Sequence, residues 1–238
     1  MSRTTIAILV LILAVGFALS PVFVPDFGGF APDQFPVPQV DPAVQPAGYA
    51  FAIWGPIYLW LITGMGYGLW RRREDEGWHA MRLALIPSLA VGSIWLAVAV
   101  ASPVWAAVLI WIMLIAALVA LYQSPVADPW FAALPVGLYA GWLTAASCVS
   151  LGLLAGGYGY LDGGTAALAA LLLALVIAAA VQSSLRRAPS YGIAVIWALV
   201  AVIVQNAGSN ITVAALAAGG ALALLLPTFK AWRSSGAD

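Results

Sequence analysis

Charged residues are scarce in this sequence. Asp, Glu, Lys and Arg make up only 8% of its 238 residues, whereas soluble domains carry about 25%. Nine basic residues balance nine acidic residues, so there is no basic excess for a nucleic acid to bind. This composition excludes a soluble enzyme, a disordered chain and a nucleic-acid-binding protein.

Cysteine and histidine are almost absent. Cys148 is the single cysteine and His79 the single histidine. One cysteine excludes an intrachain disulfide and a cysteine-based zinc site, and one histidine provides no spaced set of metal ligands. We therefore predict no metal site. We expect His79 to be solvated in a basic loop.

Long apolar runs fill the sequence instead, since 64% of the residues are hydrophobic and the mean hydropathy is +1.02. A transmembrane helix needs about 20 mostly apolar residues. The segments that meet this length are Thr4–Val24, Gly48–Trp70, Ala80–Ser102, Val104–Tyr122, Trp130–Leu154, Gly164–Ser183, Tyr191–Ala207 and Asn210–Phe229. They predict an all-α, polytopic membrane helical bundle of about eight transmembrane helices.

The distribution of charge supports this count, because Lys and Arg collect on the cytoplasmic side of membrane proteins. With eight spans, all nine basic residues fall on one side: Arg3, Arg71, Arg72, Arg73, Arg82, Arg186, Arg187, Lys230 and Arg233. The loops on the other side carry Asp26, Asp33, Asp41 and Asp162. We therefore predict that both termini are cytoplasmic.

The first apolar segment has two interpretations. Arg3, an apolar core and the triplet Ala18-Leu19-Ser20 are compatible with a cleaved signal peptide. However, Pro21 would follow the cut, and the apolar run continues to Val24. We expect a retained helix.

The apolar segments contain few groups suited to chemistry. No ionisable residue is expected in the core of a span, which argues against an ion-driven pump. Thr144, Ser147 and Ser150 form a hydroxyl cluster without a histidine or lysine in their helix to act as a base. We expect these hydroxyls to bond to helix carbonyls, and we expect no enzymatic activity.

A polar patch and two glycine pairs also stand out. We expect Gln205, Asn206 and Asn210 to cap helix ends rather than to bind a ligand. The pairs Gly64/Gly68 and Gly137/Gly141 are typical of closely packed membrane helices. The sequence leaves open whether these glycines pack within the chain or in a homodimer.

Tryptophan is abundant, with eleven residues. An interfacial belt explains those at predicted helix ends, namely Trp70, Trp78, Trp105, Trp130 and Trp232. Others lie within spans: Trp54, Trp60, Trp95, Trp111, Trp142 and Trp197. These either pack against neighbouring helices or surround a cavity that binds a flat apolar ligand by stacking.

The segment from Pro25 to Ala47 is rich in proline and alternates it with Asp, Gln and aromatic residues. Proline fixes φ and lacks an N–H group, so we expect an extended loop. The loop is either a stiff strap across the outer surface or a lid over a cavity.

The residues after this loop form a recognisable motif. Pro46, Tyr49, Phe51, Trp54 and Tyr58 resemble the signature of the tryptophan-rich sensory protein/translocator protein (TspO/MBR) family. In that family, a Pro-Gly-aromatic-x-Phe segment leads into Trp, with Tyr four residues later. Trp54 and Tyr58 are one helical turn apart and should share a face.

A second match lies in the fifth predicted helix, where Trp142 and Ser150 resemble the family's Trp and later Asn. Ser150 departs from that pattern, and so does Gly92, which precedes Trp95 where an Asn is common. The resemblance implies a five-helix translocator-like domain over residues 1–155. Residues 156–238 would add three transmembrane helices and a short cytoplasmic tail.

The resemblance also implies a function. We expect a sensor or carrier in a bacterial cytoplasmic membrane that binds a flat hydrophobic molecule, porphyrin- or sterol-like. A tetrapyrrole would be held by stacking and burial, without a protein ligand to a central metal. The predicted ligand-binding residues are Pro46, Tyr49, Phe51, Trp54, Tyr58, Trp95, Tyr139, Trp142 and Ser150.

Two other functions remain open. The chain could be a structural or assembly subunit that docks on a larger membrane complex and holds no ligand. A facilitative transporter built on the five-helix core is a weaker alternative. The expected partners are membrane lipid, a hydrophobic small molecule, and a second copy or a membrane complex.

Overall fold

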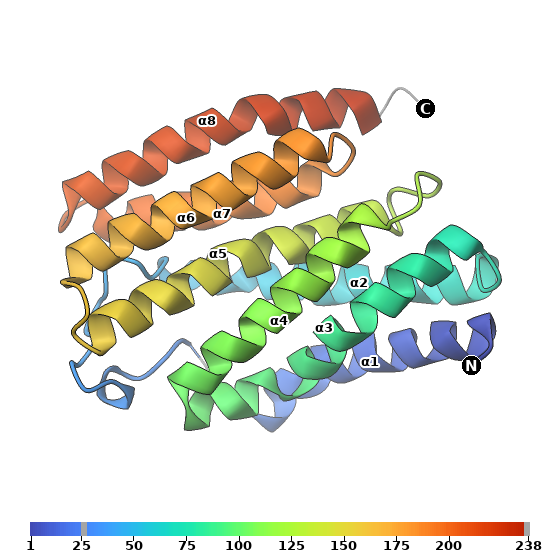
Figure 1. The fold of residues 1–238 in the computed structure, drawn as a ribbon, viewed down its shortest axis with the longest axis horizontal. Helices are drawn as coiled ribbons and strands as arrows, with labels where there is room; N and C mark the ends of the chain where they lie inside the picture. Colours follow the sequence, from blue (N-terminus) through green and yellow to red (C-terminus); the bar gives the residue numbers. More distant parts are fainter. Residues whose placement is uncertain (25–27, 236–238) are drawn as a thin grey trace.

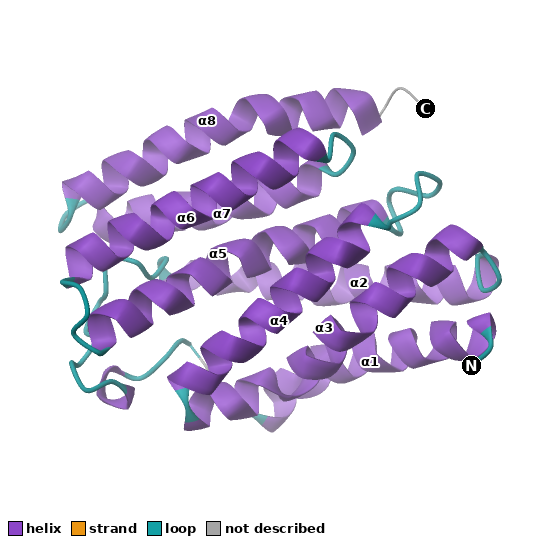
Figure 2. Cartoon of the chain, viewed as in Figure 1, coloured by secondary structure: helices purple, strands orange, loops and turns teal. Residues whose placement is uncertain are grey.

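The computed structural model describes residues 1–24 and 28–235, and these residues form a bundle of eight α-helices without a strand (Figures 1 and 2). The helices are α1 (Arg3–Phe23), α2 (Trp54–Arg71), α3 (Glu76–Ala101), α4 (Pro103–Tyr122), α5 (Ala133–Gly157), α6 (Gly163–Ser184), α7 (Pro189–Asn206) and α8 (Ile211–Ser235). Two short 3₁₀ segments, η1 (Pro32–Gln34) and η2 (Gly48–Ile53), lie between α1 and α2. Asp26, assigned to this connection, lies outside the described residues.

The prediction of a helical membrane bundle is confirmed. In the described chain, seven helices are long and apolar enough to cross a membrane. The exception is α2, which is as long as α7 at 18 residues but less apolar. Because η2 directly precedes α2, the predicted span Gly48–Trp70 consists of a 3₁₀ segment followed by an α-helix. Many large apolar side chains are exposed on the outside of the bundle, as expected for an integral membrane protein.

The two ends of the bundle differ in charge. The start of α1, the end of α8 and the α2–α3, α4–α5 and α6–α7 connections lie at one end (Figure 1), here called the basic end. The basic residues lie there, as the charge pattern predicted. The α1–α2, α3–α4, α5–α6 and α7–α8 connections lie at the opposite end, here called the loop end. That the basic end faces the cytoplasm stays a prediction.

Local sequence signals set the helix boundaries. Ser102 is extended, as expected for a residue before proline, so α3 ends there and Pro103 starts α4 at its first position. The side chain of Asp162 accepts a hydrogen bond from the backbone N–H of Thr165 at 2.9 Å and caps α6. Asn210 caps α8 in the same way through the N–H of Val213.

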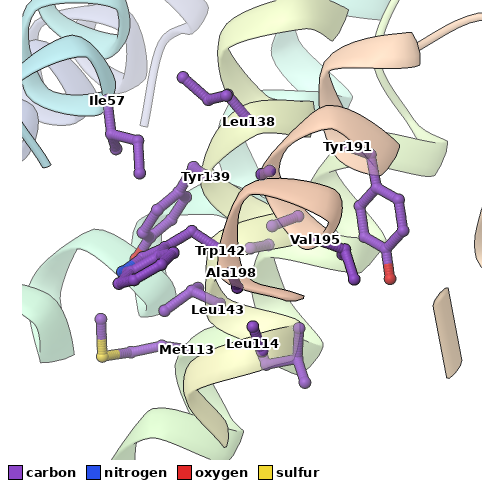
Figure 3. Close-up of a cluster of buried hydrophobic side chains, with 14 of the residues drawn as sticks. Ile57, Met113, Leu114, Leu138, Tyr139, Trp142, Leu143, Tyr191, Val195 and Ala198 are labelled. Carbon is purple, nitrogen blue, oxygen red and sulfur yellow. The ribbon is translucent and has the colours of Figure 1, made fainter. Parts of the chain in front are cut away.

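Helix α5 occupies the centre of the bundle. It contacts α4 on one side and α6 and α7 on the other, and its side chains form much of the core (Figure 3). Gly137 and Gly141 face α7 so closely that a Cβ on Gly141 would overlap the backbone of Tyr191. Gly68 of α2 likewise lies against the ring of Trp78. Both glycine pairs therefore pack within the chain rather than in a homodimer.

Three residues at the basic end differ from expectation. Trp78 is fully buried instead of lying in an interfacial belt, because Gly68 leaves room for its ring. Arg82, counted with the basic residues of the loop before the third predicted helix, is 1% exposed, and its guanidinium donates to the backbone carbonyl of Arg72 at 3.2 Å. His79 lies on α3 and is half-buried rather than solvated. The prediction failed because α3 begins at Glu76, four residues before the expected start.

An ion pair joins two connections at the basic end. Arg72 donates through Nε to Oδ2 of Asp128 at 2.7 Å, and the Tyr67 hydroxyl lies 3.0 Å from Oδ1. Hydrogen bonding from Arg72 holds the pKa of Asp128 below its usual range. This pair links the end of α2 to the loop between α4 and α5.

Replacing Gly141 with alanine should destabilise the protein by about 1–3 kcal/mol, because the new methyl group overpacks the α5–α7 contact. Thermal unfolding in detergent would measure this. Gly219→Ala in α8 is the control, since a Cβ there meets open space. Equal unfolding temperatures for the two variants would contradict the packing argument.

Asp128→Asn should lower thermal stability at neutral pH. The folded-state pKa of Asp128 is depressed, so its contribution is present above the ordinary carboxyl pKa of about 4 and is lost as pH falls through the lower folded value. The gap in melting temperature between wild type and variant should therefore narrow in acid. Glu76→Gln is the control, because its pair with Arg3 spans 3.5 Å at an exposed site and should contribute little. A difference in melting temperature that does not change with pH would show that the ionised carboxylate of Asp128 does not stabilise the fold.

Candidate functional site

A cavity of about 480 Å³ lies among α1 to α5, toward the loop end. This large cavity is lined by Phe17, Pro21, Val24, Gly28, Phe51, Trp54, Tyr58, Trp95, Leu96, Ile110, Met113, Trp142 and Ala146. Its volume falls within the range of about 300–1,000 Å³ that is typical of small-molecule sites. The aromatic excess in the sequence is therefore partly concentrated around one space.

The aromatic rings of the large cavity contact one another in defined geometries. Trp54 and Tyr58 stack with ring centroids 5.3 Å apart and an interplanar angle of 17°, which confirms that they share a helix face. Phe17 of α1 meets both rings edge-on, at 5.6 and 5.0 Å. Trp142 presents its ring nearly perpendicular to Trp54 and Phe51, at 6.1 and 6.0 Å. These contacts hold the aromatic walls in place.

A second, smaller cavity of about 80 Å³ lies on the other side of Trp142, among α5, α6, α7 and the proline-rich loop. Its residues include Pro46 and Ser150, whereas Phe51, Trp95, Ile110, Trp142 and Ala146 line both cavities. The proline-rich loop contributes Gly29, Phe30, Val44, Gln45 and Pro46 to its wall. The loop thus covers an apolar space.

The structure brings most of the predicted site residues together. Phe51, Trp54, Tyr58, Trp95 and Trp142 line the large cavity, and Pro46 and Ser150 line the small one. Their role in binding stays a prediction.

Two of the predicted residues lie elsewhere. Tyr139 is fully buried behind the cavity, where its hydroxyl lies 2.8 Å from that of Ser88 and its ring contacts Phe17. Tyr49 is 45% exposed and packs edge-on against Trp197 of α7, outside both cavities.

Sequence reasoning missed Phe17 and Met113 as cavity residues. Phe17 reaches the cavity because Gly92 of α3 faces it, and a Cβ on Gly92 would lie 2.8 Å from its ring. Gly92 stands where an Asn was expected, so this departure makes room for Phe17. The only signal in the sequence was an aromatic residue in α1, which does not reveal the direction of its side chain.

Most hydroxyl and indole groups near the two cavities already have hydrogen-bond partners within the protein. Thr144 and Ser150 donate to the carbonyls of Ala140 and Ser147 within α5, as predicted. Trp95 donates through Nε1 to the carbonyl of Ala106 at 2.9 Å. The Nε1 of Trp142 is buried and has no hydrogen-bond partner in the described chain.

The proline-rich loop, residues 28–47 of the described chain, is tied to α7. Asn206 donates to the carbonyl of Ala43 at 2.9 Å, and the backbone N–H of Ala47 donates to the carbonyl of Ala201 at 3.1 Å. Asn206 was expected to cap a helix, and the structure instead uses its amide to hold the loop. Just beyond the loop, Trp197 donates through Nε1 to the carbonyl of Ala50 at 3.0 Å.

The other part of the loop is tied to α3 and α5. Gln34 donates through Nε2 to the carbonyl of Val100 at 2.9 Å, near the end of α3, where carbonyls lack helical partners. The N–H of Val37 donates to the carbonyl of Gly157 at 2.8 Å. The loop is therefore both a strap across the loop end and a cover for the small cavity.

Comparison with known families assigns most of the chain to one family. The sequence pattern of the TSPO-like protein family matches residues 34–229, which is most of the chain. The chain belongs to the TSPO-like family. No curated protein and no solved structure matches it. The family match runs from η1 into α8 and so extends past residue 155, while the division into two domains at that residue stays a prediction.

Asn206→Leu should loosen the loop of this TSPO-like protein, because the leucine cannot donate to the carbonyl of Ala43. Hydrogen–deuterium exchange of peptides spanning residues 43–50 should become faster. Gln205→Leu is the control, since it changes the neighbouring amide on the same helix. Unchanged exchange in the Asn206 variant would mean that the remaining contacts hold the loop without it.

Proposed function

We propose that this TSPO-like membrane protein binds a flat, hydrophobic small molecule, porphyrin- or sterol-like, in the large cavity and acts as its sensor or carrier. The observation that carries the proposal is an aromatic-lined space of about 480 Å³ whose walls include the family-like residues Trp54, Tyr58 and Trp142. Offset and edge-on aromatic contacts favour a planar ligand, because each ring can add a stacking interaction.

The position of Trp142 supports this proposal. Its side chain is only 2% exposed, so the ring is held firmly among its neighbours. In Figure 3 its ring extends from α5 toward Met113, which lines the same cavity. The apolar face of the ring is therefore its contribution to the wall, and we infer a ligand with a mainly apolar face.

The packing weakens the alternative of a docking subunit without a ligand. That alternative would use the hydrophobic surface and the glycine pairs as faces for a partner. Gly68 contacts Trp78, and Gly137 and Gly141 contact α7, so these faces are used inside the chain. A facilitative transporter remains compatible with the family. It would need the proline-rich loop to detach from the helices at the loop end.

The remaining parts of the proposal concern location and chemistry. We place the protein in a bacterial cytoplasmic membrane, with the basic end and both termini on the cytoplasmic side, because basic residues collect there. We also propose that it is not an enzyme. The hydroxyls of Thr144 and Ser150 donate to helix carbonyls, and neither has a base among its hydrogen-bond partners.

Trp54→Ala should weaken the binding of metal-free protoporphyrin several-fold. Loss of one aromatic contact is worth about 1 kcal/mol, which corresponds to a factor of about five. Titration of the protein in detergent, followed by the porphyrin absorbance, gives the dissociation constant. Trp70→Ala is the control, because Trp70 is exposed at the basic end.

The iron porphyrin should bind like the metal-free form, since His79 lies on α3 at the basic end, away from the large cavity. Weak, non-saturating binding that is equal in wild type and both tryptophan variants would favour the docking subunit.

A further inference from the structure

We propose that the small cavity is a second lobe of the ligand site and accepts a short apolar branch, of vinyl or ethyl size, on the edge of the ligand. The inference rests on the proposed function, because it concerns the molecule bound in the large cavity. It narrows the ligand class to a planar, mainly apolar molecule that carries at least one such branch.

The two cavities adjoin at a common wall. Phe51, Trp95, Ile110, Trp142 and Ala146 line both of them. A molecule stacked on these rings in the large cavity therefore lies one side-chain layer from the small one. A branch directed past Trp142 would therefore point into the small cavity.

The lining of the small cavity suits hydrocarbon. Alanine, valine and leucine side chains form most of its wall, including Ala170, Ala174 and Ala198. The hydroxyl of Ser150 also lies in the wall, and it donates to the carbonyl of Ser147 at 2.7 Å. An ordered water needs two to four polar partners, so a hydrocarbon group is the better occupant of this space.

The volumes distinguish a lobe from an independent site. The small cavity has about 80 Å³ of free space, well below the range of about 300 Å³ and above for a complete small-molecule site. On the same measure about 10–15 Å³ is enough to hold one water molecule, so the space takes a branch of several heavy atoms. It is too small for a second complete ligand.

The lobe exists because α6 and α7 place small residues opposite α5. Ala174 of α6 and Ala198 of α7 are 5% and 4% exposed and line the space. Larger side chains at these positions would fill it. The helices that follow the predicted five-helix domain thus set the ligand specificity of the site, and their alanines are specificity-determining residues.

The experiment compares two metal-free porphyrins that differ only in branches. Protoporphyrin carries two vinyl groups, and deuteroporphyrin carries hydrogen in their place. Burial of two carbon atoms is worth about 0.8 kcal/mol each, so wild-type protein should bind protoporphyrin about tenfold more tightly. In Ala174→Leu the leucine occupies the lobe, and this preference should fall to about twofold or less while deuteroporphyrin binding is retained.

Ala180→Leu is the matched control, because it makes the same change on an exposed position of α6 and should keep the wild-type preference. Comparison with this variant removes the effect of unequal detergent partitioning of the two porphyrins. Ala198→Leu tests the lobe from α7 and replaces Ala174→Leu if the latter does not fold, as judged by thermal unfolding.

The outcomes separate the two proposals. If both porphyrins bind and their ratio is the same in wild type, Ala174→Leu and Ala198→Leu, the lobe is not part of the site and this inference is overturned. If neither porphyrin binds wild-type protein saturably, the proposed function fails, and the inference fails with it. A preference lost in the lobe variants and kept in Ala180→Leu supports both.

Discussion

Helix α5 can lie against the backbone of α7 only because Gly137 and Gly141 present no side chain at that contact. In a membrane, lipid is as apolar as the helices, so association depends on close packing and hydrogen bonds rather than on the hydrophobic effect. This contact joins the first five helices to the last three and places α5 at the centre. Of the helices that line the candidate site, α2, α4, α6 and α7 contact α5 directly.

The central position of α5 explains why the site has two unequal parts. On one side, Trp142 faces aromatic residues from α1, α2 and α3, whose rings surround the larger space. On the other side, the neighbours from α6 and α7 are mostly small, and Val44 and Pro46 of the loop close the space. The residues that line both cavities, among them Trp142, Phe51 and Trp95, separate the two spaces.

Hydrogen bonds at the loop end connect α7 to the site. Proline-rich backbone has few internal hydrogen bonds, so its polar groups need external partners. Asn206 and the carbonyl of Ala201 supply them on α7, and the carbonyls near the end of α3 supply them through Gln34. The side-chain amide of Asn206 in α7 therefore holds the loop that covers the site, although it lies far from the family-like motif in sequence.

The sequence by itself determined the helices, the gathering of basic residues at one end of the bundle and part of the motif. The length of an apolar run reflects bilayer thickness, Ser102-Pro103 separates α3 from α4, and the helical period places Trp54 above Tyr58. Only the tertiary structure decided that Phe17 enters the cavity, that Tyr49 stays outside it, and that Trp78 and Arg82 are buried. In a soluble helix the polar face reveals which side is buried, whereas here lipid-facing and core-facing residues are both apolar. The rotation of each helix therefore depends on close contacts with distant segments, such as Gly92 with Phe17, which no local pattern records.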